Sequence, residues 1–128
     1  MFSELIDKNT SMMPHIRTGE KGEQLAADWL SENGYHIIQR NWHSGRFEVD
    51  IIASKDTVIH FIEVKCRNSN AYGPPELSVD RKKFEHILQA AAGWLRNHPG
   101  HRIQYDVLAI TLSKNAAPEY TLFSDVYL

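Results

Sequence analysis

The sequence predicts an α/β domain in which a mixed β-sheet is flanked by helices. Two segments repeat their hydrophobic residues at helical spacing, three strand-like segments lie between them, and further strand-like sequence follows. This order, α-β-β-β-α-β with a candidate terminal strand, is typical of a sheet that helices cover. The length of 128 residues fits one domain.

The first helix is expected over residues 19–33. Hydrophobic residues form a stripe on one side and charged residues lie opposite: Leu25, Ala26, Trp29 and Leu30 against Lys21, Asp28 and Glu32. Gly34 is expected to end the helix, because glycine readily takes the left-handed conformation that follows a helix. Residues 1–18 contain Pro14 and show little periodicity, so we interpret them as a loose arm before a single domain over residues 19–128.

Three strands are expected next, over residues 35–42, 47–53 and 57–67. The second and third are rich in Ile, Val and Phe, and a short polar turn around residues 54–56 separates them. Two such runs joined by a short turn are typical of a hairpin. If the hairpin is centred at Asp56-Thr57, its register follows directly from the sequence.

The sequence of the second half of the chain predicts a loop, then a helix, then one or two strands. Residues 68–76 contain Gly and two prolines and should form the loop. Ser78 is a candidate cap for a helix whose hydrophobic residues recur at helical spacing: Phe84, Ile87, Leu88, Ala91 and Leu95. Strands are then expected over residues 103–112 and 120–127.

Composition narrows the class of protein. The net charge of −2 and a pI near 6.4 weigh against a protein that coats nucleic acid by bulk charge, but they are compatible with a nuclease whose bound cations supply positive charge. No apolar run approaches the roughly 20 residues that a membrane span needs. The lone Cys66 cannot form an internal disulfide and no export signal is visible, so we expect a cytoplasmic protein with no membrane partner.

The candidate site lies on the predicted hairpin. Strand alternation places Phe47, Val49, Ile51 and Ala53 on one face of the second strand, and Asp50 on the other. In the third strand Glu63 and Lys65 share a face, and the predicted register puts Asp50 opposite Glu63.

Two neighbouring carboxylates repel each other unless a positive charge intervenes, and Mg²⁺ suits such oxygen ligands. Lys65 could then position or deprotonate an attacking water, or neutralise charge on a phosphate. An ordinary pair of charged residues on a half-exposed strand explains Glu63 and Lys65 equally well, so the motif carries little weight alone.

Glu23 is a candidate third acid. It falls inside the apolar arc of the first helix, where an unpaired carboxylate costs free energy. We therefore expect the helix to direct it towards the sheet. The alternatives are that Glu23 reaches the rim of the stripe, or that Glu20, one turn earlier, is the functional acid.

Basic residues near this site are candidates for binding a nucleic-acid backbone: Arg40, Arg46, Arg67 and Lys83. Lys83 lies one turn before Ile87 and so nearer the sheet side, although a solvated helix face is the plain alternative. A zinc pair at His98 and His101 is disfavoured, because no Cys or acid lies beside them. Cys66 points away from Lys65 and is expected in the core.

Taken together, the motifs resemble the bacterial YraN family of predicted endonucleases. They are GExGExxAAxxL (19–30), GY (34–35), RN (40–41), EVDIIA (48–53), FIEVKxR (61–67), SV (78–79) with Lys83, and YDV (105–107), where x is any residue. The resemblance covers about residues 19 to 110. It implies the PD-(D/E)XK superfamily, similarity to archaeal Holliday junction resolvases, and a restriction-endonuclease-like αβββαβ core.

The resemblance also implies a metal site. Mg²⁺, with Mn²⁺ as a substitute, would be bound by Asp50 and Glu63, with help from Glu23 and the backbone carbonyl of Val64. Lys65 would be the catalytic lysine.

Three further positions are informative. Glu48 matches an acid of the family motif without a defined role. Phe47 stands where the family usually has Gly, and Gln104 stands where it usually has Arg, which predicts one phosphate contact fewer.

These patterns favour a divalent-metal-dependent endodeoxyribonuclease that hydrolyses DNA phosphodiester bonds, with branched or junction DNA as a candidate substrate. A resolvase needs two sites and hence a two-fold homodimer. The alternative is a nucleic-acid-binding module that keeps the nuclease fold without cleavage, and a third hypothesis is a protein-docking scaffold. Clustered acids favour the enzyme, because a pure binder gains little from acids near phosphate.

Overall fold

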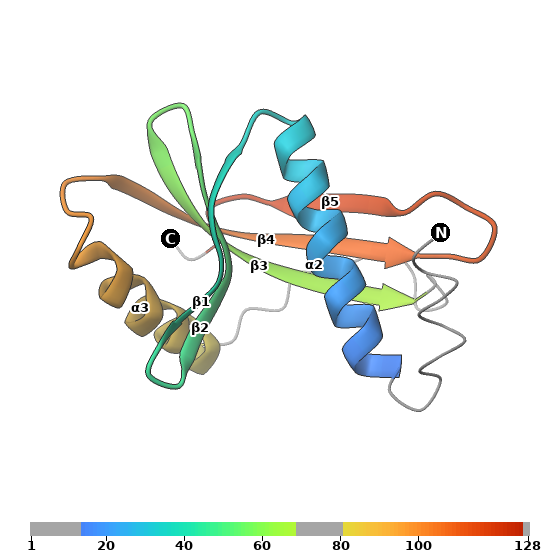
Figure 1. Ribbon diagram of the computed structural model, residues 1–128, viewed down its shortest axis with the longest axis horizontal. Coiled ribbons are helices and arrows are strands. Elements are labelled where there is room, and N and C mark those ends of the chain that lie inside the picture. The colour runs from blue at the N-terminus through green and yellow to red at the C-terminus, as the bar shows by residue number, and fades with distance from the viewer. Residues whose placement is uncertain (1–13, 69–80, 127–128) are drawn as a thin grey trace.

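The computed structural model describes residues 14–68 and 81–126, which form a five-stranded sheet with a helix on each face (Figure 1). The elements follow the predicted order. They are helix α2 Pro14–Glu32, strands β1 His36–Ser44, β2 Phe47–Lys55 and β3 Val58–Asn68, helix α3 Arg81–Leu95, and strands β4 Arg102–Leu112 and β5 Glu119–Phe123. This is the α-β-β-β-α-β order of a restriction-endonuclease-like core, with one strand added.

The sheet is mixed, as predicted. Its strand order is β1-β2-β3-β4-β5, so strands that follow one another in the chain are also neighbours in the sheet. Only β3 and β4 pair in parallel, and the other neighbours are antiparallel. A parallel pair needs a crossover connection, and α3 lies within that connection.

Each helix buries its apolar stripe against a different face of the sheet. The α2 face holds Ala26, Ala27 and Leu30 from the helix, packed on buried residues of β2, β3 and β4: Ile51, Ala53, Ile62, Leu108 and Ile110. The α3 face holds Ile87, Ala90, Ala91 and Trp94, packed on Val49, Ile52, Ile59 and Phe61. Two buried clusters therefore sandwich the sheet and fix both helices relative to β2 and β3.

Strand β2 bends at Asp50, and this bend corrects the predicted side-chain alternation. Phe47 and Val49 pack with the α3 cluster, whereas Ile51 and Ala53 belong to the α2 cluster, so the four residues do not share a face. Figure 1 shows the β1–β2 hairpin curling out of the plane of β3 and β4 towards α3. The prediction was wrong because packing against α3 rotates the end of the hairpin, which a strict period of two does not anticipate.

Contacts with α3 hold this end of the hairpin in place. The indole Nε1 of Trp42 donates a hydrogen bond of 2.9 Å to the carbonyl of Ala90. Gly93 lies so close to β1 that a Cβ at this position would come within 2.8 Å of the Cβ of Ser44. The bend is therefore built into the packing of α3 on β1 and β2.

The β2–β3 turn confirms the predicted register. Lys55 pairs with Val58 across a two-residue turn at Asp56 and Thr57, which have φ angles of 52° and 66°. Positive φ at both central residues is typical of the type I′ turn that suits a twisted hairpin. The ladder then runs back to Ile51 opposite Ile62, which brings Asp50 and Glu63 to its end.

Several element boundaries differ from those predicted. Helix α2 begins at Pro14 rather than Gly19, and proline suits the first turn of a helix because no hydrogen bond of its missing N–H is lost. Strand β5 ends at Phe123, short of the predicted Tyr127. The loop expected over residues 68–76 and the cap expected at Ser78 lie almost entirely outside the described residues. Neither described helix has the length and apolar character that crossing a bilayer demands.

Candidate active site

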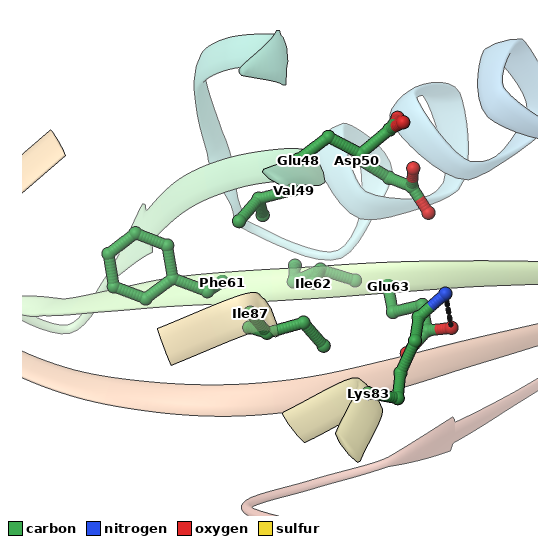
Figure 2. A pocket seen from close by; sticks show the side chains of 8 residues that line it. All are labelled: Glu48, Val49, Asp50, Phe61, Ile62, Glu63, Lys83 and Ile87. Carbon is green, nitrogen blue, oxygen red and sulfur yellow. Dashed lines mark ion pairs between the residues drawn. The ribbon is translucent and has the colours of Figure 1, made fainter. Parts of the chain in front are cut away.

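A pocket of about 220 Å³ opens where β2 leaves β3. Acidic and basic side chains line its mouth and apolar ones its inner part: Glu48, Asp50, Glu63 and Lys83, with Val49, Phe61, Ile62 and Ile87. Figure 2 shows Glu48 and Asp50 extending from β2 on the same side as Glu63 from β3 and Lys83 from α3. The predicted pair of carboxylates is thus brought to one pocket.

Asp50 lies at the bend, where its side chain, and not its backbone, bonds to strand β3. Backbone pairing between β2 and β3 stops at Ile51, and the amide of Val64 donates a 2.8 Å hydrogen bond to Oδ2 of Asp50. Burial raises the pKa of the Asp50 carboxyl, and the charges of Glu23, Glu48 and Glu63 add to it, so that the pKa reaches about 6 although the Val64 bond lowers it.

The Glu63 side chain is nearly buried, and only one of its two carboxylate oxygens has a partner among the described residues. Its side chain is 13% exposed, and Oε2 lies 3.3 Å from the ammonium of Lys83. The other oxygen, Oε1, is buried and accepts no hydrogen bond from the described residues. A buried oxygen without a donor lowers the stability of the fold by roughly 1–3 kcal/mol, so Oε1 of Glu63 is a candidate to bind a ligand.

Glu23, on helix α2, lies close enough to Asp50 for its charge to act on that residue, but it does not line the pocket. The amide nitrogen of Asn41 lies 3.1 and 3.2 Å from its two carboxylate oxygens, and its charge acts on Asp50. The preceding residue, Gly22, is buried against Cys66, where an added Cβ would come within 2.7 Å of the Cys66 Cβ. This close approach of α2 to β3 explains why a half-buried carboxylate on α2 lies within electrostatic range of the sheet.

The residues Lys65, Glu20 and Val64 do not line the pocket. Lys65 continues the face of β3 that carries Glu63, but it is exposed and outside the set that lines the pocket. Glu20 is exposed. For Val64 the contact that the structure shows is the one through its amide, to Asp50. The roles predicted for these three positions stay predictions.

The basic residues predicted to meet phosphates are spread around the pocket. Arg40 donates to Oε1 of Gln24 at 3.1 Å, and Arg46 packs over the ring of Phe47 at 5.3 Å. The Nε of Arg67 donates to the hydroxyl of Thr111 at 3.3 Å. Of the four basic candidates, Lys83 is the one within the described pocket.

Asn41 is the residue near the site whose role the sequence did not reveal. It is exposed, has a φ of 53°, and holds Glu23 from β1, beside the Arg40–Gln24 hydrogen bond. Asparagine tolerates positive φ better than most residues. The signal present in the sequence was its place beside Arg40 in the family pattern, but its partner on α2 depends on the tertiary fold.

Gln104, which stands where the family usually has Arg, donates a hydrogen bond of 3.0 Å to Oδ1 of the buried Asp106.

The acids partly fit a divalent cation. Asp50 and Glu63 offer carboxylate oxygens, the ligands that Mg²⁺ prefers, and the unpartnered Oε1 of Glu63 supplies a free, buried acceptor. In the described part of the chain, no three His, Cys, Asp or Glu side chains are arranged as a finished metal centre. Glu23 is therefore near Asp50 without being a preformed third ligand.

Comparison with known proteins gives a consistent family. The model of the uncharacterised protein family UPF0102 matches residues 22–110, which include every residue that lines the pocket. A UPF0102 protein of Chlorobium phaeobacteroides is 43% identical over 112 residues, covering 86% of this chain and 87% of that protein. A UPF0102 protein of Rhodococcus opacus is 37% identical over 118 residues, covering 91% of this chain and all of that protein. The chain therefore belongs to the UPF0102 family, the YraN-type family that its motifs resemble.

Proposed function

We propose that this protein is a divalent-metal-dependent endonuclease that hydrolyses DNA phosphodiester bonds. The observation that carries the proposal is the meeting of Asp50 and Glu63 at the end of the β2–β3 ladder, with Oε1 of Glu63 buried and without a donor. Natural proteins rarely keep such an unsatisfied acid cluster for stability alone. A divalent cation held by Asp50 and Glu63 would remove both the repulsion between the carboxylates and the unmet acceptor.

The residues divide the chemistry between them. Asp50 and Glu63 would hold Mg²⁺ or Mn²⁺, and the amide of Val64 keeps Asp50 in place. The bound cation supplies the positive charge that stabilises the phosphate in the transition state. Lys65, two residues beyond Glu63, would position the attacking water or neutralise the phosphate.

Hydrolysis itself requires one bond to form and one to break. The water gives up one proton as its oxygen bonds to phosphorus, the bond from phosphorus to the leaving sugar oxygen breaks, and that sugar oxygen takes up a proton. Glu23, which Asn41 holds by both carboxylate oxygens, would assist in holding the cation. Glu48 adds negative charge at the mouth of the pocket.

The finer proposal concerns the DNA. A branched or four-way-junction substrate agrees with the family resemblance to junction resolvases, and cutting two strands of a junction in concert requires a second copy of the site. We therefore propose a two-fold homodimer for that substrate.

Cleavage of labelled four-way-junction, flap and plain duplex DNA tests the function. We expect cutting with Mg²⁺ or Mn²⁺, none with EDTA, and a loss of roughly 10²-fold or more in Asp50→Asn. Asp28→Asn, the same change at an exposed position of α2 and purified in the same way, should cut normally, which would show that the loss is specific to Asp50.

Two results would oppose the proposal. Undiminished cutting by folded Asp50→Asn would move the chemistry away from this pocket. Tight DNA binding by the wild-type protein without any cutting under either metal would make the chain a nucleic-acid-binding module that retains the nuclease fold.

A further inference from the structure

Lys83 is the one basic residue among the eight described residues that line the pocket. It comes from the first turn of α3, whereas the acids around it come from β2 and β3. Its ammonium lies 3.3 Å from Oε2 of Glu63, and Figure 2 shows the two side chains next to each other with this ion pair dashed. A helix on one face of the sheet thus delivers a cation to the acids of the proposed metal site.

The local charge explains why the ammonium lies there. Glu48, Asp50 and Glu63 line the pocket together with Lys83. Burial lowers the pKa of Lys83, but attraction to Glu63, Asp50 and Glu48 and the bond to Glu63 outweigh burial and raise it. Lys83 therefore stays charged and compensates part of the negative charge of the pocket.

A divalent cation would bind the same carboxylate, through the unpartnered Oε1. Two positive charges would then lie close to the ammonium on Oε2, and like charges at such distances repel strongly. The Lys83 side chain is 52% exposed and carries its ammonium on a flexible four-carbon stem, so the ammonium has room to move towards solvent. Glu63, at 13% exposure, cannot follow it.

We propose that Lys83 is an internal counter-cation, which neutralises Glu63 while the site lacks metal and is displaced when a divalent cation binds. The proposal deepens the proposed function and rests on it, since it assumes that the metal binds at Glu63. Its consequence is that wild-type affinity for metal is lower than the carboxylates alone would give, because each binding event must break the Lys83–Glu63 pair.

Calorimetric titration of the full-length, metal-free protein with Mn²⁺ tests this idea without any need for activity. Lys83→Gln should bind Mn²⁺ roughly threefold to tenfold more tightly than the wild type, because the competing ammonium is gone. Lys82→Gln removes the same charge one position away, outside the residues that line the pocket, and should stay within about twofold of the wild type. Lys83→Met, which keeps most of the apolar stem, should behave like Lys83→Gln.

Thermal unfolding separates displacement from a purely structural role. Without metal, Lys83→Gln should melt below the wild type, and added Mn²⁺ should raise its melting temperature by more than it raises that of the wild type. Mn²⁺ binding to Lys83→Gln that is equal to or weaker than wild-type binding overturns the inference, while the proposed metal site stands. If neither protein binds Mn²⁺, or if Asp50→Asn binds it as well as the wild type, the metal site and the inference fall together.

Discussion

Two aspartates, Asp106 and Asp50, differ in how many hydrogen bonds their carboxylates accept, and their pKa values shift in opposite directions. Asp106 is 2% exposed but accepts three hydrogen bonds, from His60 at 2.7 Å, from Gln104 at 3.0 Å and from the amide of Asp125 at 2.8 Å. Burial alone would raise its pKa, but these bonds outweigh burial and lower it. Among the described residues, Asp50 accepts one hydrogen bond, from the amide of Val64, and has three acids nearby, so its pKa rises to about 6.

This contrast predicts that Asp50→Asn stabilises the metal-free protein at neutral pH. Well below pH 3.8, Asp50 is protonated in both the folded and unfolded states and contributes no difference. As the pH rises to 6, the unfolded chain ionises before the folded one, so the wild type loses stability, and the loss is complete above pH 6. A pKa raised from 3.8 to about 6 corresponds to roughly 3 kcal/mol in the free energy of unfolding.

Urea unfolding in EDTA at pH 4 and at pH 7.5 measures this effect. Asp50→Asn should differ little from the wild type at pH 4, where the effect has only begun, and exceed it clearly at pH 7.5, since an asparagine oxygen can still accept from Val64. Asp28→Asn, at an exposed site, should change stability little at either pH. A less stable Asp50→Asn at pH 7.5 would show that the charged carboxylate is well compensated in the folded protein.

At the residue scale, the sequence predicted neighbours along the hairpin better than partners across the fold. The centre of the turn at Asp56-Thr57 sufficed to put Asp50 beside Glu63, because hairpin register follows from the turn. The contacts of Asn41 with Glu23 and of Lys83 with Glu63 join elements that are distant in the chain. No local pattern specifies such pairs, so the sequence named these residues as site candidates or motif positions without indicating which of them contact each other.

At the scale of elements, the approach of α2 to β3 positions the third acid. Gly22 faces Cys66 so closely that a Cβ would lie 2.7 Å from its Cβ and 3.0 Å from its Sγ. Both contact atoms belong to the start of a side chain on a paired strand, so they cannot move far. The helix must therefore shift if residue 22 is enlarged, and Glu23 shifts with it.

Gly22→Ala should consequently lower the free energy of unfolding by about 1–3 kcal/mol, as overpacking of a tight contact does. Chemical denaturation measures this change, with Ser31→Ala, on an exposed part of the same helix, expected to stay within about 0.5 kcal/mol of the wild type. In a double-mutant cycle with Cys66→Gly, the cost of Gly22→Ala should shrink, because the atoms that the methyl group meets are removed. Additive costs would place the close contact elsewhere.

The elements themselves were predictable, but the path of β2 was not. Hydrophobic periodicity located both helices and all five strands, since each buries a stripe or a face against the sheet or a helix. The bend at Asp50 arises because Val49 packs with α3 while Ile51 packs with α2. Alternation resumes beyond the bend, where Ile52 packs in the α3 cluster between Ile51 and Ala53 of the α2 cluster, so it fails only across Asp50.

At the scale of the whole molecule, the proposed site gathers groups from all three layers. The sheet supplies Asp50 and Glu63, α2 supplies Glu23, and α3 supplies Lys83. Two separate hydrophobic clusters fix the helices on opposite faces, so the charged groups are held by packing that none of them provides. This arrangement explains how a chain with a net charge of −2 can gather several acids in one place without losing its fold.

The membership of the chain in UPF0102 agrees with this architecture, because the family match spans α2 from Gly22 through most of β4. The order of elements was predictable because each motif sits at a fixed place in it: the acid of α2, the aspartate of β2 and the Glu-x-Lys of β3. The family is uncharacterised, so its chemistry must be read from the site itself.

The most direct test of the central claim is the position of Mn²⁺ in crystals of the wild-type protein soaked with that metal, located by its anomalous scattering. We predict one main peak between the carboxylates of Asp50 and Glu63, with the Lys83 ammonium moved away from Glu63, and no such peak in Asp50→Asn crystals. Mn²⁺ bound at other residues while Asp50 and Glu63 stay unliganded, with the Lys83–Glu63 pair intact, would contradict the account.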